Sequence, residues 1–371
     1  MRPKRFVLAA MAAFVASAVA VVLLGVWLNP WGGFGPVGFH RLPNGRYTKT
    51  KHIDAMPKGQ RPQIYVLGSS NVMRYSADTI ERLWGKKAFN YGVFWGRPED
   101  FYAIAEHLYE DLGERPEMFI VGLDVWSLRR PEVIGNPVFE GMRRRLINTP
   151  TLSRHLDEYS RVKHAWASVT DALSQQHLEE GFRARRGTTR APWPESLPTR
   201  ELSAWGGRTW YVNSYNWEVE RVGTDVFEAV EAGTLRISDA FRERVLKDPR
   251  REFDFFSQYV FDELWPKRVD YLERFLASAE EHGTKVAVVL NPVQPLFRQY
   301  LLEKSPYASL LERQKALLRE MQERHPNLII VLDVTRIEEL GADPEGFFDE
   351  IHPATRNCDL ILERLAEELA R

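Results

Sequence analysis

The chain has 371 residues, a formal net charge of −1, and 44% apolar and 12% aromatic residues. This composition is typical of a globular protein with ample core material, and the near-neutral charge argues against a dedicated nucleic-acid binder. The single cysteine, Cys358, excludes an intramolecular disulfide and a cysteine-based zinc site. At about 150 residues per domain, the length fits two domains or one α/β domain with a large insertion equally well.

The N-terminal segment predicts a membrane anchor. An uncharged apolar run extends from Phe6 to Leu28 and follows three basic residues: Arg2, Lys4 and Arg5. A helix of this length crosses a bilayer. The positive-inside rule orients the N-terminus toward the cytoplasm, so we expect everything after Leu28 to lie outside.

A cleaved signal peptide is the alternative for this segment. Ala16-Ser17-Ala18 has the small-residue form of a cleavage site, but the apolar run continues to Leu28 without a polar cleavage zone. That length favours an uncleaved anchor over residues 1–28. Residues 29–62 begin rich in Gly, Pro and Trp and become polar, so we expect a linker there.

The first predicted strand ends in a turn that contains two serines. Four apolar residues, Ile64-Tyr65-Val66-Leu67, precede Gly68-Ser69-Ser70-Asn71, which is typical of a buried parallel strand and its exit. Chemistry in open α/β sheets takes place beyond the carboxyl ends of such strands. A serine in this turn has a backbone N–H beside it that can donate to an oxyanion, but the same composition also suits an ordinary turn.

Further strands and helices alternate along the chain. We expect strands at 88–93, 118–124, 285–290 and 328–333, and helices at 76–84, 98–112, 259–281, 311–324 and from about 355. This alternation predicts a parallel sheet covered by helices. The pattern breaks over residues 129–255, where charge is dense and no segment resembles a central strand. We therefore expect an irregular, helical insertion within an α/β domain of residues 63–371.

A carboxylate and a histidine lie close together near the C-terminus. Asp349 and His352 are three residues apart, and Pro353 marks the start of the last helix. At this separation a carboxylate can bind the imidazole Nδ1–H and leave Nε2 free as a base. A polar loop with an incidental histidine is the alternative for this pair alone.

Four short blocks occur in the order found in the SGNH (GDSL-like) hydrolase superfamily. They are Gly68-Ser69-Ser70, Asn90-Tyr91-Gly92 through Gly96, Gly122-Leu123-Asp124, and Asp349-x-x-His352-Pro353. The chain resembles that superfamily over roughly 63–128 and 255–371, which implies a flavodoxin-like three-layer parallel sheet. The anchor and the Gly-Ser-Ser form are most similar to those of exported proteins that modify cell-envelope polymers. This similarity implies a bacterial inner-membrane protein with a periplasmic domain.

The resemblance assigns a role to each matching residue. Ser70 resembles the nucleophile, His352 its general base and Asp349 the acid that orients the base. The Ser70 N–H and the Gly96 N–H correspond to the oxyanion hole. Gly92 is the alternative to Gly96, because the spacing in this chain is one residue longer than usual.

One block departs from the family pattern. The family normally supplies an asparagine donor in the third block, where this chain has Asp124. A carboxylate repels an oxyanion, and the loss of one such donor typically costs about 10²–10³ in rate. Either another donor substitutes, with Asn71 and Asn291 as candidates, or hydrolysis is slow or absent.

The chemistry implied is acyl transfer through an acyl-enzyme on Ser70. Water as the acceptor gives an esterase, and a sugar hydroxyl gives an O-acyltransferase. The resemblance implies an acylated envelope polysaccharide as substrate, with acetyl as the expected acyl group. It also implies a membrane acyl-transfer protein as a partner. Neither a metal nor an organic cofactor is needed.

Two other functions remain open from the sequence. One is a non-catalytic binding or assembly component of a polysaccharide modification or export complex, which Asp124 favours. The other is a lipid or small-ester hydrolase. An open aromatic groove in the insertion would suit a polymer. The aromatic residues that could form it are Trp205, Trp210, Tyr211, Tyr215 and Trp217. These aromatic residues also suit the core of a small subdomain.

Overall fold

The computed structural model describes residues 3–28, 45–93, 95–129, 149–157, 160–175, 178, 181–182, 263–344, 346–347 and 350–371. Asp349, the predicted orienting acid, lies outside the described residues. Most of the predicted insertion, including the aromatic residues between 205 and 217, also lies outside them.

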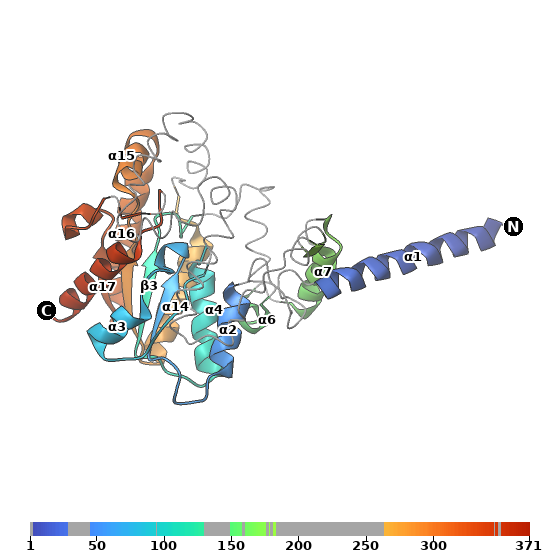
Figure 1. The fold of residues 1–371 in the computed structure, drawn as a ribbon, viewed down its shortest axis with the longest axis horizontal. Helices are drawn as coiled ribbons and strands as arrows, with labels where there is room; N and C mark the ends of the chain where they lie inside the picture. The colour runs from blue at the N-terminus through green and yellow to red at the C-terminus, as the bar shows by residue number, and fades with distance from the viewer. Residues whose placement is uncertain are drawn as a thin grey trace.

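A five-stranded sheet forms the centre of the α/β domain (Figure 1). Its strand order is β2-β1-β3-β4-β5, and every neighbouring pair is parallel. The strands are β1 (Ile64–Gly68), β2 (Ala88–Asn90), β3 (Met118–Leu123), β4 (Lys285–Leu290) and β5 (Leu328–Asp333). The predicted α/β class with a parallel sheet is confirmed. All five predicted strands are present, but the strand predicted at 88–93 ends at Asn90.

The central strands are buried on both faces, which explains their continuous apolar sequences. Every residue of β1 and β3 is buried. Because successive side chains of a strand point to opposite faces, Tyr65 and Leu67 contribute to one apolar cluster, and Ile64 and Val66 to the other. A parallel sheet needs such a helical layer on each face.

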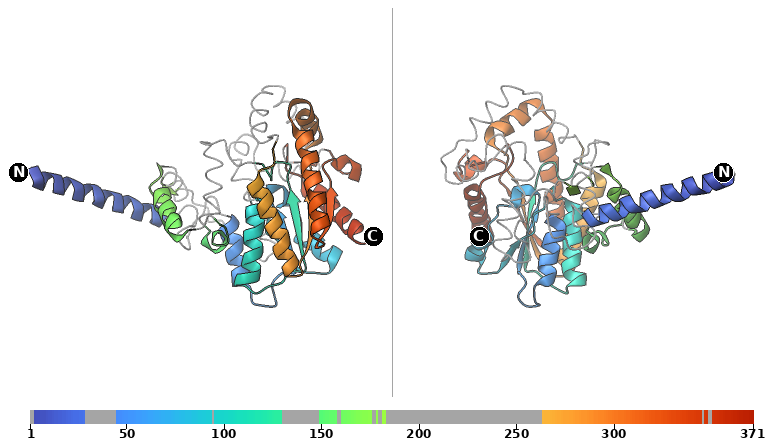
Figure 2. Two further views of the ribbon diagram at one scale, coloured as in Figure 1. Left: turned by 180° about the vertical axis from the view of Figure 1, so that it is seen from behind. Right: turned by 45° about the vertical axis from the view of Figure 1, so that its right-hand side comes forward.

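Helices cover both faces of the sheet (Figures 1 and 2). The apolar cluster on the first face includes residues of α2 (Gly45–Ala55), α4 (Pro98–Glu106), α14 (Pro266–Glu281), α15 (Pro295–Lys304) and α16 (Tyr307–Arg324). The cluster on the second face includes residues of α3 (Ala77–Trp84) and α17 (Thr355–Leu369). The described part of the domain also contains short helices. They are the 3₁₀ helices η1 (Ser70–Val72) and η4 (Ile337–Leu340), the π-helix η2 (His107–Asp111), and α6 (Pro150–Ser153).

Helix α1 (Pro3–Leu28) extends away from the α/β domain (Figures 1 and 2). It is long and apolar enough to cross a membrane, and its apolar window is not buried by the rest of the chain. Helix α7 (Arg161–Ala172) contacts it. A Cβ at Gly25 would overlap the carbonyl group of Ala172, so the glycine lets the two backbones approach closely.

Helix α2 is the main departure from the sequence prediction, because its residues belong to the range predicted as a linker. Its sequence is polar, yet Arg46, Lys49 and Thr50 are buried against the domain. Arg46 forms a two-point ion pair with Asp100 of α4, with Nε–Oδ1 and Nη2–Oδ2 distances of 2.6 and 2.8 Å. Contacts with residues far along the chain therefore hold this helix against the domain, and its sequence has no apolar periodicity that would have predicted it.

Lys49 joins α2 to the loop that follows β2. Its Nζ donates to the carbonyl oxygens of Asn90 and Gly92 at 2.7 and 2.8 Å. Burial lowers the pKa of Lys49 to about 7. A neutral amine retains two N–H groups, enough for both carbonyl oxygens.

This lowered pKa predicts a pH-dependent stability. In the unfolded chain a lysine keeps its ordinary pKa near 10.4, so above about pH 7 the unfolded state binds more protons than the folded state. The free energy of unfolding should therefore rise between pH 7 and 9, with a slope of up to about 1.4 kcal/mol per pH unit. Denaturant unfolding across this range should show the rise in the wild type and a flatter profile in Lys49→Met. Equal slopes in the two proteins would contradict the assignment.

Candidate active site

The predicted site residues meet at the carboxyl ends of three adjacent strands. Ser70 follows β1, Asp124 follows β3 and Asn291 follows β4. Since β2 and β3 lie on opposite sides of β1, the chain leaves β1 at the point where the strand order reverses. Doubly wound sheets bind their ligands in the crevice at such a point.

The turn after β1 presents Ser70 at the start of a helical turn. Gly68 has φ 152°, a conformation that residues with a Cβ rarely adopt. Ser69 is the N-cap of η1, and its Oγ accepts from the Asn71 N–H at 3.2 Å. The first N–H groups of a helix have no acceptor within it. The Ser70 N–H is the other such group of η1, which makes it suitable as an oxyanion donor.

Ser70 and His352 are in hydrogen-bond contact. The Ser70 Oγ lies 2.8 Å from His352 Nε2, and the imidazole is 3% exposed. The loop that carries His352 is held by a bridge between Phe347 and Pro353 and by the Ala354 N–H, which donates to the Gly346 carbonyl at 2.8 Å. The structure thus brings together the residues predicted as nucleophile and base from opposite ends of the domain.

Asp124 is a buried acceptor at the base of the site. Its Oδ1 accepts from the side-chain amides of Asn71 and Asn291, at 2.7 and 2.8 Å. Burial raises the pKa of Asp124, and hydrogen bonds from Ser69, Asn291 and Asn71 oppose that rise. The carboxyl group therefore connects η1 to the end of β4, beneath Ser70.

These contacts bear on the expected oxyanion donors. Asn71 and Asn291, the candidates to replace the family asparagine, each direct an amide N–H toward Asp124. The Gly96 N–H donates to the Val93 carbonyl oxygen at 2.9 Å, and the Gly92 N–H donates to Asn90 Oδ1 at 2.9 Å. Each of these four groups thus already donates one hydrogen bond within the protein, whereas the Ser70 N–H stands at the start of η1, where the helix itself supplies no acceptor.

The loop with Gly96 packs tightly against the Ser70 turn. A Cβ at Gly96 would overlap the carbonyl group of Gly68, so no larger residue fits there without movement of the backbone. The preceding residue, Trp95, has φ 53°, in the left-handed region. Strained backbone of this kind clusters at functional sites.

Three supporting residues received no role in the sequence-based prediction, although Asn90 stands in one of its four blocks. Asn90 donates from Nδ2 to the carbonyl oxygens of Val72 and Tyr75, at 2.6 and 2.9 Å, and so fixes the turn after Ser70. Gln314 of α16 donates to the Asp124 carbonyl oxygen at 3.1 Å. Lys49 holds the β2 loop from α2. The position of Asn90 at a strand end is a local signal in the sequence. Gln314 and Lys49 act on distant segments, so the sequence around them carries no such signal.

Two substitutions of Asp124 test its role as an acceptor. Asp124→Asn keeps an oxygen for both asparagine amides, so the free energy of unfolding should change by less than about 1 kcal/mol. Asp124→Leu leaves buried donors without an acceptor, at about 1–3 kcal/mol each. In denaturant unfolding, the leucine variant should be at least about 2 kcal/mol less stable than the asparagine variant. Equal stabilities would mean that Asp124 does not organise the site.

No protein-family model matches the chain, and no curated protein sequence matches it. Function is therefore inferred from the site itself. A serine hydroxyl within reach of an imidazole, beside a backbone N–H at a helix start, is chemically suited to nucleophilic attack on a carbonyl group.

Proposed function

We propose that the protein is an SGNH-like serine acyl-transfer enzyme that removes or transfers acyl groups on a cell-envelope polysaccharide. The contact that supports this most directly is the 2.8 Å distance between Ser70 Oγ and His352 Nε2 at the carboxyl end of β1. The order of the family blocks in the sequence adds to it. Acetyl is the acyl group that the resemblance favours.

The proposed reaction has two steps. His352 Nε2 accepts the Ser70 proton as Oγ attacks an ester carbonyl, and the Ser70 N–H stabilises the oxyanion that forms. The imidazolium then protonates the leaving alcohol, which gives an acyl-serine. In the second step His352 takes a proton from water or from a sugar hydroxyl, whose oxygen attacks the acyl-serine; the Oγ–acyl bond breaks, and His352 returns that proton to the Ser70 Oγ. Asp349 is proposed to orient His352 through Nδ1.

The proposed location is the bacterial inner membrane, with α1 as a single-pass anchor and the α/β domain in the periplasm. The length and apolar character of α1 and the basic residues before its apolar run support this orientation. An enzyme tethered there would reach a polysaccharide during export, and a membrane acyl-transfer protein would be its natural partner.

The test is covalent labelling of the full-length protein in detergent with a fluorophosphonate. We expect one label per chain on Ser70, identified by intact mass and peptide mapping, and none on Ser70→Ala. Ser69→Ala is the matched control: it loses an N-cap, which costs about 1 kcal/mol, but keeps the Ser70–His352 pair and should still be labelled. A folded wild-type protein that takes up no label on Ser70 would refute the proposal.

A non-catalytic binding or assembly component is the second candidate. The observation that favours it is the carboxylate of Asp124 where the family has a donor, together with the Gly92 and Gly96 N–H groups bonded within their own loop. In that case the labelling experiment would give no product, and the same crevice would be examined for polysaccharide binding.

A further inference from the structure

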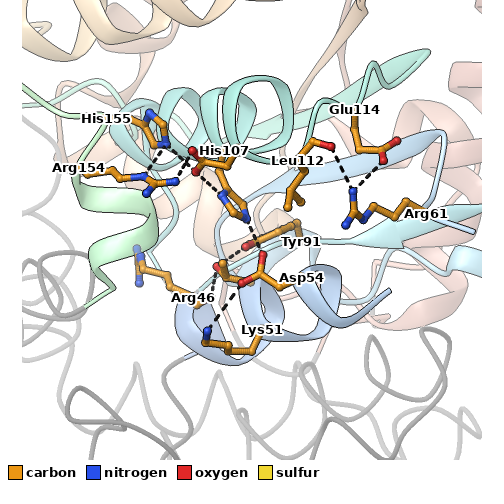
Figure 3. Close-up of polar contacts among 12 residues, drawn as sticks. Arg46, Lys51, Asp54, Arg61, Tyr91, His107, Leu112, Glu114, Arg154 and His155 are labelled. Atoms are coloured by element: carbon orange, nitrogen blue, oxygen red, sulfur yellow. Dashed lines mark hydrogen bonds and ion pairs between the residues drawn. The ribbon is translucent and has the colours of Figure 1, made fainter. Parts of the chain in front are cut away.

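A second cluster of reactive side chains surrounds His107, in the connection between α4 and β3. The His107 ring is 2% exposed and lies between two carboxylates (Figure 3). Its Nε2 is 2.8 Å from Asp54 Oδ1, and its Nδ1 is 2.7 Å from Asp111 Oδ2. His155, just after α6, brings its Nε2 to within 3.1 Å of the same Asp111 oxygen.

The backbone at this cluster is unusual. α4 continues into the π-helix η2, in which the Leu112 N–H donates to the His107 carbonyl oxygen at 3.2 Å. The π-helical segment places His107 and Asp111 on one side of the chain, with their side chains in contact. π-helical segments are rare and occur frequently at functional sites.

Both ring nitrogens of His107 contact carboxylate oxygens, which is more than one imidazole proton can satisfy. A neutral imidazole carries one proton. If Nε2 donates that proton to Asp54, Nδ1 and Asp111 Oδ2 face each other as two lone pairs 2.7 Å apart. Only a second proton or a metal ion between them makes this contact favourable.

The distances suit a small divalent ion. His107 Nδ1, Asp111 Oδ2 and His155 Nε2 all lie within 4.8 Å of one another. Bonds of about 2.0–2.1 Å in a tetrahedron set the ligand atoms about 3.3 Å apart. The observed contacts of 2.7 and 3.1 Å therefore need to open by about 0.6 and 0.2 Å to reach that separation. Two imidazoles and one carboxylate favour zinc over magnesium or calcium, which prefer oxygen ligands.

The groups around these three atoms match those that support metal ligands. Asp54 accepts from the distal nitrogen of His107, as carboxylates commonly do for metal-binding histidines. Arg154 contacts the other oxygen of Asp111, and its Nε donates to His155 Nε2 at 3.5 Å, a long contact that a bound metal would replace.

We propose that His107, Asp111 and His155 form a Zn²⁺ site, with Asp54 and Arg154 as its outer hydrogen-bond partners. The site joins α2, the α4–β3 connection and the segment after α6. Because a helix between parallel strands runs antiparallel to them, the end of α4 lies toward the amino ends of the strands, away from Ser70. The metal has a structural role: it fixes α2 and the segment after α6 to the domain.

Metal binding to the full-length protein in detergent tests this site. After treatment with a chelator and dialysis against Zn²⁺ alone, the wild type should bind one zinc per chain by atomic emission, with a higher melting temperature than the metal-free protein. His155→Gln changes a side chain near the surface, and its zinc affinity should be at least about tenfold weaker. Co²⁺ in place of Zn²⁺ should give the visible absorption of a tetrahedral site in the wild type only.

His325→Gln is the matched control. His325 also lies between two carboxylates, with Nδ1 3.1 Å from Glu280 and Nε2 2.9 Å from Glu273, but the structure shows no second imidazole within that cluster of described residues. This variant should bind zinc as the wild type does. A wild type that binds no zinc, or equal binding by His155→Gln and the wild type, would show that the cluster is an ion-pair network and would overturn the proposal.

Discussion

Replacement of His352 by alanine is expected to slow the phosphonylation of Ser70 by about 10²–10⁴-fold, the usual contribution of a general base. The structure gives the reason: Nε2 is 2.8 Å from the Ser70 Oγ and is the atom that would take the hydroxyl proton. Without it, the nucleophile is an ordinary serine hydroxyl, which is weak at neutral pH. The second-order rate constant for fluorophosphonate labelling, followed by intact mass, measures the effect.

His325→Ala controls for the loss of a buried imidazole elsewhere in the domain, because His325 is 8% exposed and His352 is 3% exposed. Its labelling rate should stay within a few-fold of the wild type. A His352→Ala protein that is folded and labelled as fast as the wild type would remove His352 from the proposed mechanism, even if Ser70 itself were reactive.

The elements that the sequence predicts well are those whose signal is local. A buried parallel strand requires a continuous apolar run, and such runs predict strands at 285–290 and 118–124. The structure has them as Lys285–Leu290 and Met118–Leu123. The turn of Gly68 to Asn71 also has a local signal, because small polar residues directly after an apolar strand are typical of a turn. The contact between Ser70 and His352 was expected from a resemblance, and the structure brings the two side chains together.

What the sequence does not reveal depends on contacts between distant segments. Asp124 differs from the asparagine found in the superfamily that the sequence resembles, but its role as acceptor for Asn71 and Asn291 exists only once three strand ends converge. α2 was missed because its buried face is polar and is satisfied by partners in the β2 loop and α4. A periodicity analysis assigns such a face to solvent.

Replacement of Arg46 by methionine is expected to cost about 3–5 kcal/mol of stability, the usual loss when one partner of a buried ion pair is removed. The Arg46 and Asp100 side chains are 4% and 2% exposed, so the remaining carboxylate would be buried without its counter-charge. Asp100 would keep only the Arg97 N–H, at 3.1 Å, as a donor among the contacts described here. Thermal unfolding of the full-length protein in detergent should show a fall in melting temperature of about 10 °C.

Two further variants separate the buried charge from the packing of the arginine stem. Arg46→Met with Asp100→Asn removes both charges and keeps an oxygen for the N-cap of α4, so it should recover a large part of the loss. Arg82→Met breaks an exposed pair with Glu363 and should cost no more than about 1 kcal/mol. If Arg46→Met were as mild as Arg82→Met, α2 would not be fixed by this pair.

The same variant also tests whether α2 supports the candidate active site. Arg46 and Lys49 lie on one helix, and Lys49 holds the carbonyl oxygens of Asn90 and Gly92, in the loop that packs beside the Ser70 turn. If α2 loosens, this loop loses its two hydrogen bonds from Lys49. Fluorophosphonate labelling of Ser70 should then slow in Arg46→Met and recover in the double variant, below the melting temperature of each. Labelling that is unchanged while stability falls would confine α2 to a purely structural role. A parallel loss and recovery would link α2 to the geometry of the proposed nucleophile, Ser70.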